Sequence, residues 1–151
     1  MGYTHYWRQP WQALAPEKWA LIVSDVKKIL ATTDVPLLRE YDEPGTKPEI
    51  TTDLIRFNGV ADEGHETFYF ERTPGEDVDY QKQQPKHYVK AFSFCKTAHK
   101  PYDVVVCACL IIIRHHAPKV DMSSDGDYPD WAAGHALVLE ATGQNCLVLL
   151  D

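Results

Sequence analysis

The chain has 151 residues, of which 44% are hydrophobic and 11% aromatic, and its formal charge is −7 at pH 7. This size and composition predict a single globular domain, residues 1–151, and exclude a disordered tail. The negative charge argues against a protein that follows an extended nucleic-acid backbone, because such proteins carry a basic stripe. No apolar run reaches the ~20 residues that cross a bilayer and no secretory signal is visible, so we expect a cytoplasmic protein with reduced cysteines and no membrane contact.

The first elements along the chain are a strand and a long helix. Tyr3, His5 and Trp7 alternate with other side chains in a pattern typical of a strand. Pro16 fits the first turn of a helix, and apolar residues then recur at spacings of three and four as far as Leu30. We therefore predict an amphipathic helix of about four turns here.

The next segment predicts a loop, a hairpin and an insertion. Residues 33–52 contain three prolines and little periodicity, so we expect a loop. Residues 54–58 and 67–72 both alternate between apolar and polar side chains, and a turn-rich connection separates them, which predicts a β-hairpin. Residues 73–86 are polar and predict a mobile, solvent-facing insertion.

The second half of the chain contains one ambiguous run, residues 104–113. Its β-branched residues favour a strand, but the segment from Pro101 to His116 is long for a strand, and we prefer a buried helix. The other predicted elements are a strand at 87–95, a short strand at 119–123, a helix at 130–142 and an edge strand at 145–150. The elements together predict an α+β fold, with a mostly antiparallel four- or five-stranded sheet and about three helices packed largely on one face.

Two polar runs, residues 94–103 and 123–131, each precede a predicted helix and predict an anion site. Helix starts expose unpaired N–H groups and the positive end of the helix dipole. Lysines and hydroxyls gathered there can hold a phosphate or carboxylate, although the same residue types also serve as ordinary caps and turns. The predicted ligand-binding residues are Arg56, Lys96, Thr97, Tyr102, Ser123, Ser124, His5 and His65.

An alternative prediction is catalytic and involves His65, Glu66 and Thr67. On a strand, the imidazole of His65 and the hydroxyl of Thr67 would lie on the same face, as a general acid–base group and a phosphate contact. This spacing resembles one half of the paired signature of two-histidine phosphoesterases. The second half is missing, so binding without catalysis is the preferred prediction.

Neither a metal site nor a cofactor is predicted. Cys107 and Cys109 would point to nearly opposite sides of a helix and could not share an ion. The chain contains neither a CxxC pair nor an HExxH motif. Cys95 lies beside a lysine, a setting that lowers the pKa of a thiol, so a cysteine nucleophile is a further alternative to a packed cysteine.

Several stretches together carry a family resemblance. They are MGYTHYW at residues 1–7, RFNG at 56–59, GHETF at 64–68, FCKT at 94–97, KPYD at 100–103 and SSDG at 123–126. With these stretches the chain resembles a family of small bacteriophage, prophage and bacterial proteins of about this length. The resemblance covers most of residues 1–143 and brings no activity. It implies that the protein inhibits a host process, by capturing a nucleotide signal or by masking a host protein.

The leading hypothesis is therefore a binding module for a small phosphorylated molecule, such as a nucleotide signal, in a phage counter-defence role. One alternative is a phosphoesterase that uses His65. Another is an inhibitor whose acidic surface meets a basic host protein. That surface comprises Asp62, Glu63, Glu76, Asp77 and Asp79. A symmetric homodimer is the expected form of any self-association.

Overall fold

The structure is a computed structural model that describes residues 2–75 and 78–151. The fold is α+β, as the sequence predicts. The strands of the described residues are β1 (Thr4–Gln9), β2 (Leu37–Leu38), β3 (Glu49–Ile50), β4 (Leu54–Gly59), β5 (Phe68–Glu71), β6 (Ala91–Lys96) and β7 (Asp121–Ser124). The α-helices of the same residues are α1 (Pro16–Thr32), α2 (Asp79–Lys82), α3 (Asp103–His116) and α4 (Ala132–Thr142), and 3-10 turns form at Ala61–Glu63 and Tyr128–Trp131.

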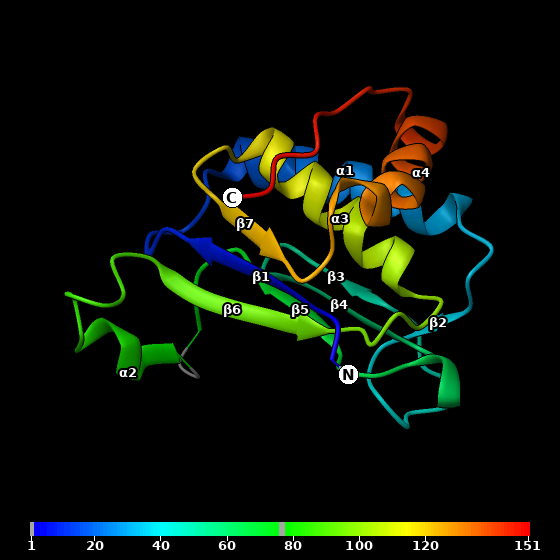
Figure 1. Ribbon diagram of the computed structural model, residues 1–151, viewed down its shortest axis with the longest axis horizontal. Helices are drawn as coiled ribbons and strands as arrows, with labels where there is room; N and C mark the ends of the chain where they lie inside the picture. Colours follow the sequence, from blue (N-terminus) through cyan, green and yellow to red (C-terminus); the bar gives the residue numbers. More distant parts are fainter. Residues whose placement is uncertain (1, 76–77) are drawn as a thin grey trace.

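The strands form two antiparallel sheets. In the first sheet, β1 lies between β6 and β7. In the second sheet, β4 pairs with β2, β3 and β5, and the predicted hairpin is the β4–β5 pair. Helices α1, α3 and α4 all lie on the same side of the strands (Figure 1). The predicted class and the one-sided helix layer are therefore confirmed, with the strands divided between two sheets.

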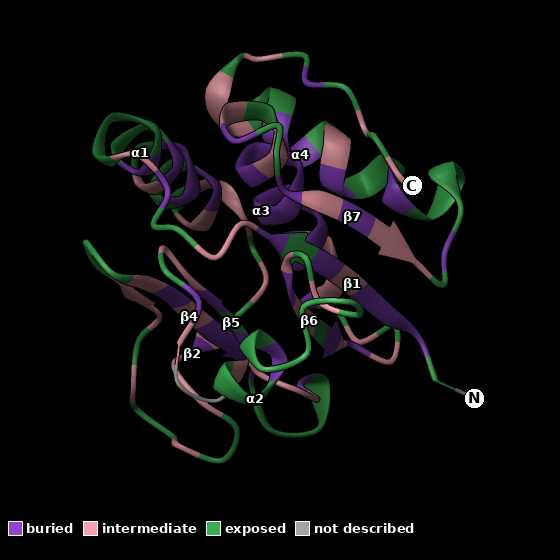
Figure 2. Ribbon diagram, turned by 90° about the vertical axis from the view of Figure 1, so that its left-hand side faces the viewer, coloured by how far each residue is buried: buried purple, intermediate pink, exposed green. Residues whose placement is uncertain are grey.

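Helix α3 forms the centre of the core and resolves the ambiguous run at residues 104–113. Every residue from Val105 to Ile113 is buried, and this stretch of α3 is buried on all of its sides (Figure 2). A helix that is apolar all round is stable only in such a position, and burial there outweighs the strand preference of its β-branched residues. Among the described residues, no helix has both the length and the apolar character needed to cross a membrane.

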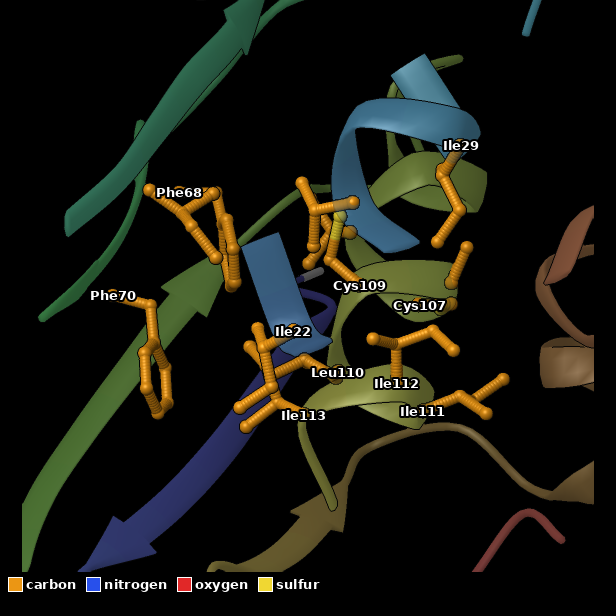
Figure 3. Packing of buried hydrophobic residues seen from close by; sticks show 14 of the residues in the cluster. Ile22, Ile29, Phe68, Phe70, Cys107, Cys109, Leu110, Ile111, Ile112 and Ile113 are labelled. Carbon is orange, nitrogen blue, oxygen red and sulfur yellow. The ribbon is translucent and has the colours of Figure 1, made fainter. Parts of the chain in front are cut away.

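The core around α3 is built from helix and strand side chains together. Ile22 and Ile29 reach α3 from α1, while Phe68 and Phe70 point toward it from β5 (Figure 3). The Phe68 ring also packs against Trp7, with ring centres 5.6 Å apart. Such contacts between aromatic rings join the two sheets beneath the helices.

Two predicted strand positions are wrong. Residues 87–90 do not continue β6, because the backbone N–H groups of His87 and Tyr88 donate to the Gln84 carbonyl in a turn. Residues 145–150 form no strand in the described chain, although the tail lies beside β7 (Figure 1). The N–H of Asp151 donates to the Met122 carbonyl, so the tail is held at its end and not along a strand ladder.

The predicted polar insertion at residues 73–86 contains α2 and one anchor to β6. The Gln81 side chain is buried, and its amide nitrogen donates to the Phe92 carbonyl at 3.0 Å. Its amide oxygen accepts the Phe92 N–H at 2.8 Å. β6 lies at the edge of its sheet, and the Gln81 side chain thus satisfies both the N–H and the carbonyl group of Phe92 on this edge.

Candidate functional site

A buried asparagine holds the turn between β4 and β5. The Asn58 amide nitrogen donates to the His65 carbonyl at 2.8 Å and to the Thr67 hydroxyl at 3.0 Å. Its oxygen accepts the N–H groups of Gly59 at 2.7 Å and His65 at 3.1 Å. Gly59 and Gly64 allow the two arms of this turn to touch, because a Cβ atom on Gly59 would lie 2.3 Å from the Glu63 carbonyl oxygen. The position of His65 is therefore fixed from inside the protein.

A surface hollow of about 370 Å³ opens beside this turn. Its lining comprises Tyr41, Ala61, Asp62, Gly64, His65, Glu66 and Lys100. The Nδ1 atom of His65 is buried and has no hydrogen-bond partner among the described residues. The hollow thus brings together an imidazole, an ammonium group, two carboxylates and an exposed tyrosine ring.

Glu66 connects the hollow to β6 and α3. Its backbone N–H donates to the Lys96 carbonyl at 3.1 Å, and its carboxylate accepts the Lys96 N–H at 2.7 Å. The Glu66 carbonyl in turn accepts the Tyr102 hydroxyl at 2.5 Å. The bond to the Glu66 carboxylate is charge-assisted and therefore stronger than a neutral one, so this wall of the hollow is tied to the core.

Four residues other than glycine have a left-handed backbone in the segments that line the hollow, and one of them, Asp42 with φ 58°, directly follows Tyr41. Ala61, with φ 49°, lines the hollow, and Ala98 and His99, with φ 52° and 58°, directly precede Lys100. Such conformations cost about 1–3 kcal/mol each and occur most often at functional sites. The chain therefore carries local strain on all three segments that supply the hollow.

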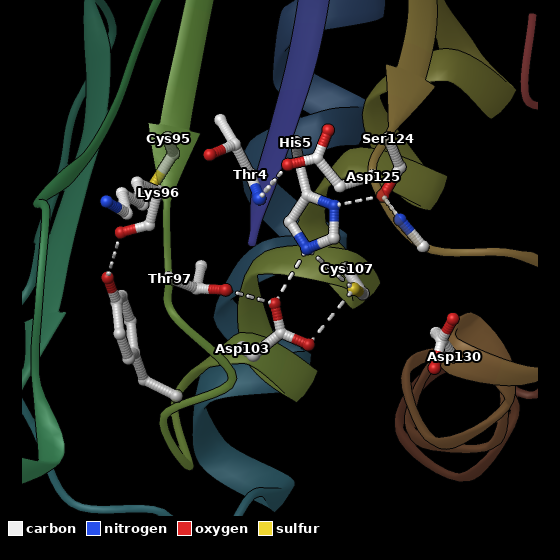
Figure 4. Close-up of polar contacts among 12 residues, drawn as sticks. Thr4, His5, Cys95, Lys96, Thr97, Asp103, Cys107, Ser124, Asp125 and Asp130 are labelled. Carbon is white, nitrogen blue, oxygen red and sulfur yellow. Dashed lines mark hydrogen bonds and ion pairs between the residues drawn. The ribbon is translucent and has the colours of Figure 1, made fainter. Parts of the chain in front are cut away.

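A second polar cluster lies deeper in the fold, around the buried side chain of His5 (Figure 4). The His5 Nε2 atom lies 2.6 Å from Asp103 Oδ1, and its Nδ1 atom lies 2.8 Å from Ser124 Oγ. The Thr97 hydroxyl donates to Asp103 Oδ1 at 2.6 Å. The Cys107 sulfur lies 3.5 Å from His5 Nε2 and 3.8 Å from Asp103 Oδ2.

The electrostatics of this cluster favour a charged carboxylate. Burial alone would raise the pKa of Asp103, but the hydrogen bonds from His5 and Thr97 outweigh it, and the pKa lies below its ordinary value. Burial, followed by the nearby Asp103 charge, raises the pKa of the Cys107 thiol well above its ordinary value. At neutral pH the cluster therefore contains the ionised carboxylate of Asp103 and the protonated thiol of Cys107.

The predicted ligand-binding residues fall into different places. His65 lines the hollow. His5, Thr97 and Ser124 meet in the buried cluster around Asp103. Arg56 belongs to neither place: its Nε atom lies 3.4 Å from Glu49 Oε1, and its NH1 atom lies 3.9 Å from Glu40 Oε2.

Of the remaining predicted residues, Lys96 and Tyr102 hold the framework around the hollow, whereas Ser123 belongs to β7. The Lys96 backbone and the Tyr102 hydroxyl both bind Glu66, as described above. Ser123 pairs with Tyr6 across β7 and β1. The structure thus separates the predicted anion site into one surface hollow and one buried cluster.

The predicted catalytic residues are only partly together. His65 and Glu66 both line the hollow, but residues 65–67 precede β5 and do not lie on a strand. The Thr67 hydroxyl donates to a Glu40 carboxylate oxygen and accepts from the Asn58 amide. The strand geometry on which the His65–Thr67 pairing rested is therefore wrong.

All four cysteines lie within the described residues and are free and buried. Burial is the largest cause that raises the pKa of Cys95 above its ordinary value, and it is the cause that raises the pKa of Cys109. The lowered pKa expected for Cys95 is therefore wrong, because the neighbouring Lys96 does not offset desolvation.

These buried thiols predict slow chemical modification. A thiol with a raised pKa is protonated at about pH 8 and reacts slowly, because the thiolate is the nucleophile. We expect an aromatic disulfide reagent to modify no cysteine within minutes in the folded protein and all four in guanidinium. Rapid modification of one thiol in the folded protein would contradict this burial.

Three of the five acidic residues of the proposed protein-interaction surface lie within the described residues. Asp62 and Glu63 are exposed on the 3-10 turn, and Asp79 begins α2 beside Lys82, with a separation of 3.8 Å. Glu76 and Asp77 lie outside the described residues. Asp62 also lines the hollow, so part of this surface borders the candidate site.

Sequence reasoning did not select Asn58, Asp103 or Cys107. Asp103 and Cys107 gain their roles from His5, which is distant in the chain. For Asn58 a local signal existed: a polar residue at the end of a strand, followed by glycine, commonly marks a turn. Searches of protein-family models, of curated proteins and of solved structures found no match to this chain.

Proposed function

We propose that this protein binds a small phosphorylated ligand of the nucleotide type in the hollow beside His65. The observation that carries the proposal is that His65 and Lys100 line the same hollow of about 370 Å³, and that the buried Nδ1 atom of His65 has no hydrogen-bond partner among the described residues. Ligand pockets commonly have volumes of about 300–1,000 Å³ and a few convergent polar groups.

The chemistry of the lining matches the three parts of a nucleotide. Lys100 supplies a positive charge for a phosphate, and the imidazole of His65 can donate a hydrogen bond to it. The carboxylates of Asp62 and Glu66 can accept hydrogen bonds from sugar hydroxyl groups, a role that acidic residues take in dinucleotide sites. The exposed ring of Tyr41 offers a face on which a base can stack.

The rigidity of the surroundings also supports binding. Asn58 fixes the His65 turn and Glu66 fixes the adjoining end of β6, so little ordering is needed when a ligand enters. A capture protein in a counter-defence role requires such a prepared site. The acidic rim, including Asp62, favours a ligand with hydroxyl groups over free phosphate.

A phosphoesterase is the second candidate, and one observation favours it. His65 and Glu66 line the same hollow, so an imidazole and a carboxylate could both reach a bound phosphate ester. In that case the ligand would be converted and not merely held. A binding module releases its ligand unchanged, whereas a phosphoesterase yields a new product.

The proposal predicts that Lys100→Gln weakens nucleotide binding about ten- to 100-fold, because hydrogen bonds to charged groups contribute about 1.5–3 kcal/mol. Equilibrium dialysis against labelled AMP, a cyclic dinucleotide and ADP-ribose measures the dissociation constants. Lys86→Gln, at an exposed lysine outside the hollow, is the matched control and should bind as the unmodified protein does. Equal affinities for the two variants would remove Lys100 from the site.

A further inference from the structure

We propose that His5, Asp103 and Cys107 form a binding site for a divalent transition-metal ion of the zinc type. One ligand atom from each residue lies within 4.8 Å of the others. His5 comes from the central strand β1, and the other two come from the first turns of α3. This site is separate from the hollow beside His65 and does not depend on the function proposed for it.

The donor set suits zinc. Imidazole nitrogen, thiolate sulfur and carboxylate oxygen are the three protein ligand types of Zn²⁺, and soft thiolate disfavours Mg²⁺ and Ca²⁺. Asp103 and Cys107 are four residues apart, so both side chains leave the same face of α3 toward His5. His5 is fully buried, and the Asp103 side chain is 15% exposed, which leaves an approach from solvent at the carboxylate.

The distances to the sulfur already match tetrahedral coordination. Metal–ligand bonds of about 2.0–2.3 Å place tetrahedral ligand atoms roughly 3.3–3.8 Å apart. The Cys107 sulfur lies 3.5 Å from His5 Nε2 and 3.8 Å from Asp103 Oδ2. The His5 Nε2–Asp103 Oδ1 distance of 2.6 Å is a hydrogen bond, so this contact must open when an ion enters.

The hydrogen bonds behind the ligands are those a metal site needs. Ser124 Oγ lies 2.8 Å from His5 Nδ1, so it can accept the Nδ1–H and leave Nε2 free for the ion. The Thr97 hydroxyl donates to Asp103 Oδ1 and leaves Oδ2 to face the ion. On binding, Cys107 loses its thiol proton to solvent, and the imidazole proton of His5 moves from Nε2, where it bonds Asp103, to Nδ1, where Ser124 Oγ accepts it. Thiolate and carboxylate together balance the two positive charges of the ion.

Cobalt titration of chelator-treated protein tests the site, because Co²⁺ bound by a thiolate absorbs in the near ultraviolet. We expect one Co²⁺ per chain with this thiolate absorption, and its displacement by Zn²⁺. Cys107→Ser should lose the absorption and weaken binding more than about 100-fold, and Ser124→Ala should weaken binding about tenfold. Cys109→Ser is the matched control, since this buried cysteine lies on the same helix outside the cluster and should bind normally.

Two results would overturn the proposal. One is the absence of stoichiometric binding by the unmodified protein. The other is binding without thiolate absorption, which would place the ion on surface histidines such as His115. Both results are measured on the unmodified protein, so the test remains valid even if the Cys107→Ser variant does not fold.

Discussion

Replacing Asn58 with alanine is expected to lower the free energy of unfolding by about 3 kcal/mol and to abolish ligand binding in the hollow, because each buried polar group left unsatisfied costs about 1–3 kcal/mol. The side chain is fully buried and satisfies the N–H groups of Gly59 and His65 together with the His65 carbonyl. Without it, the turn that presents His65 loses its internal support. Urea unfolding and equilibrium dialysis of the same preparation measure the two effects.

The control for this prediction is Asn145→Ala. Asn145 is exposed and contacts only the His135 ring among the interactions of the described residues, at 2.9 Å. Its replacement should change the free energy of unfolding by less than about 0.5 kcal/mol, as is usual for surface substitutions. If Asn58→Ala were as stable as this control, the turn would not depend on the asparagine.

Replacing His5 with alanine in chelator-treated protein is expected to lower the free energy of unfolding by about 3 kcal/mol, near the lower end of the 3–5 kcal/mol range for breaking a buried pair. The change removes a partner from the largely buried Asp103 carboxylate and leaves a cavity between β1 and α3. The lower end applies because Asp103 keeps some contact with water and its bond from Thr97. Chemical denaturation measures the loss.

A double-mutant cycle separates this pair from general packing. If His5 and Asp103 interact as described, the double alanine variant will lose less stability than the sum of the two single variants. His87→Ala, at an exposed histidine, should be nearly neutral. Strictly additive losses from His5 and Asp103 would contradict a direct interaction.

The elements with strong local patterns could be predicted from the sequence. Helix α1 follows from its Pro16 start and its apolar spacing, and the β4–β5 hairpin follows from two alternating segments around a turn. Helix α3 was predicted from the length of its apolar segment, although its β-branched residues favour a strand. In the structure, burial on all sides of the helix outweighs that preference. The start of β6 was missed because a local turn binds the N–H groups of His87 and Tyr88 to the Gln84 carbonyl. The tail after residue 145 was missed because its end is held by bonds with distant residues, among them Met122.

The candidate site was harder to predict because it is made of distant residues. His5 and Asp103 are separated by 98 positions, and the hollow joins Tyr41, His65 and Lys100 from three separate loops. The polar runs indicated where hydroxyls and lysines gather but not which of them meet. Arg56 shows this limit, because its charge is directed to Glu49 and Glu40, one on a neighbouring strand and one in a loop.

The measurement that tests the central proposal most directly is ligand depletion and release. The protein is mixed with a panel of cyclic dinucleotides, mononucleotides and ADP-ribose derivatives, filtered, and then heat-denatured, and both filtrates are chromatographed. We predict that one member disappears from the first filtrate and returns unchanged in the second. A new product peak would instead show a phosphoesterase, and a panel recovered in full from the first filtrate would contradict nucleotide binding by this hollow.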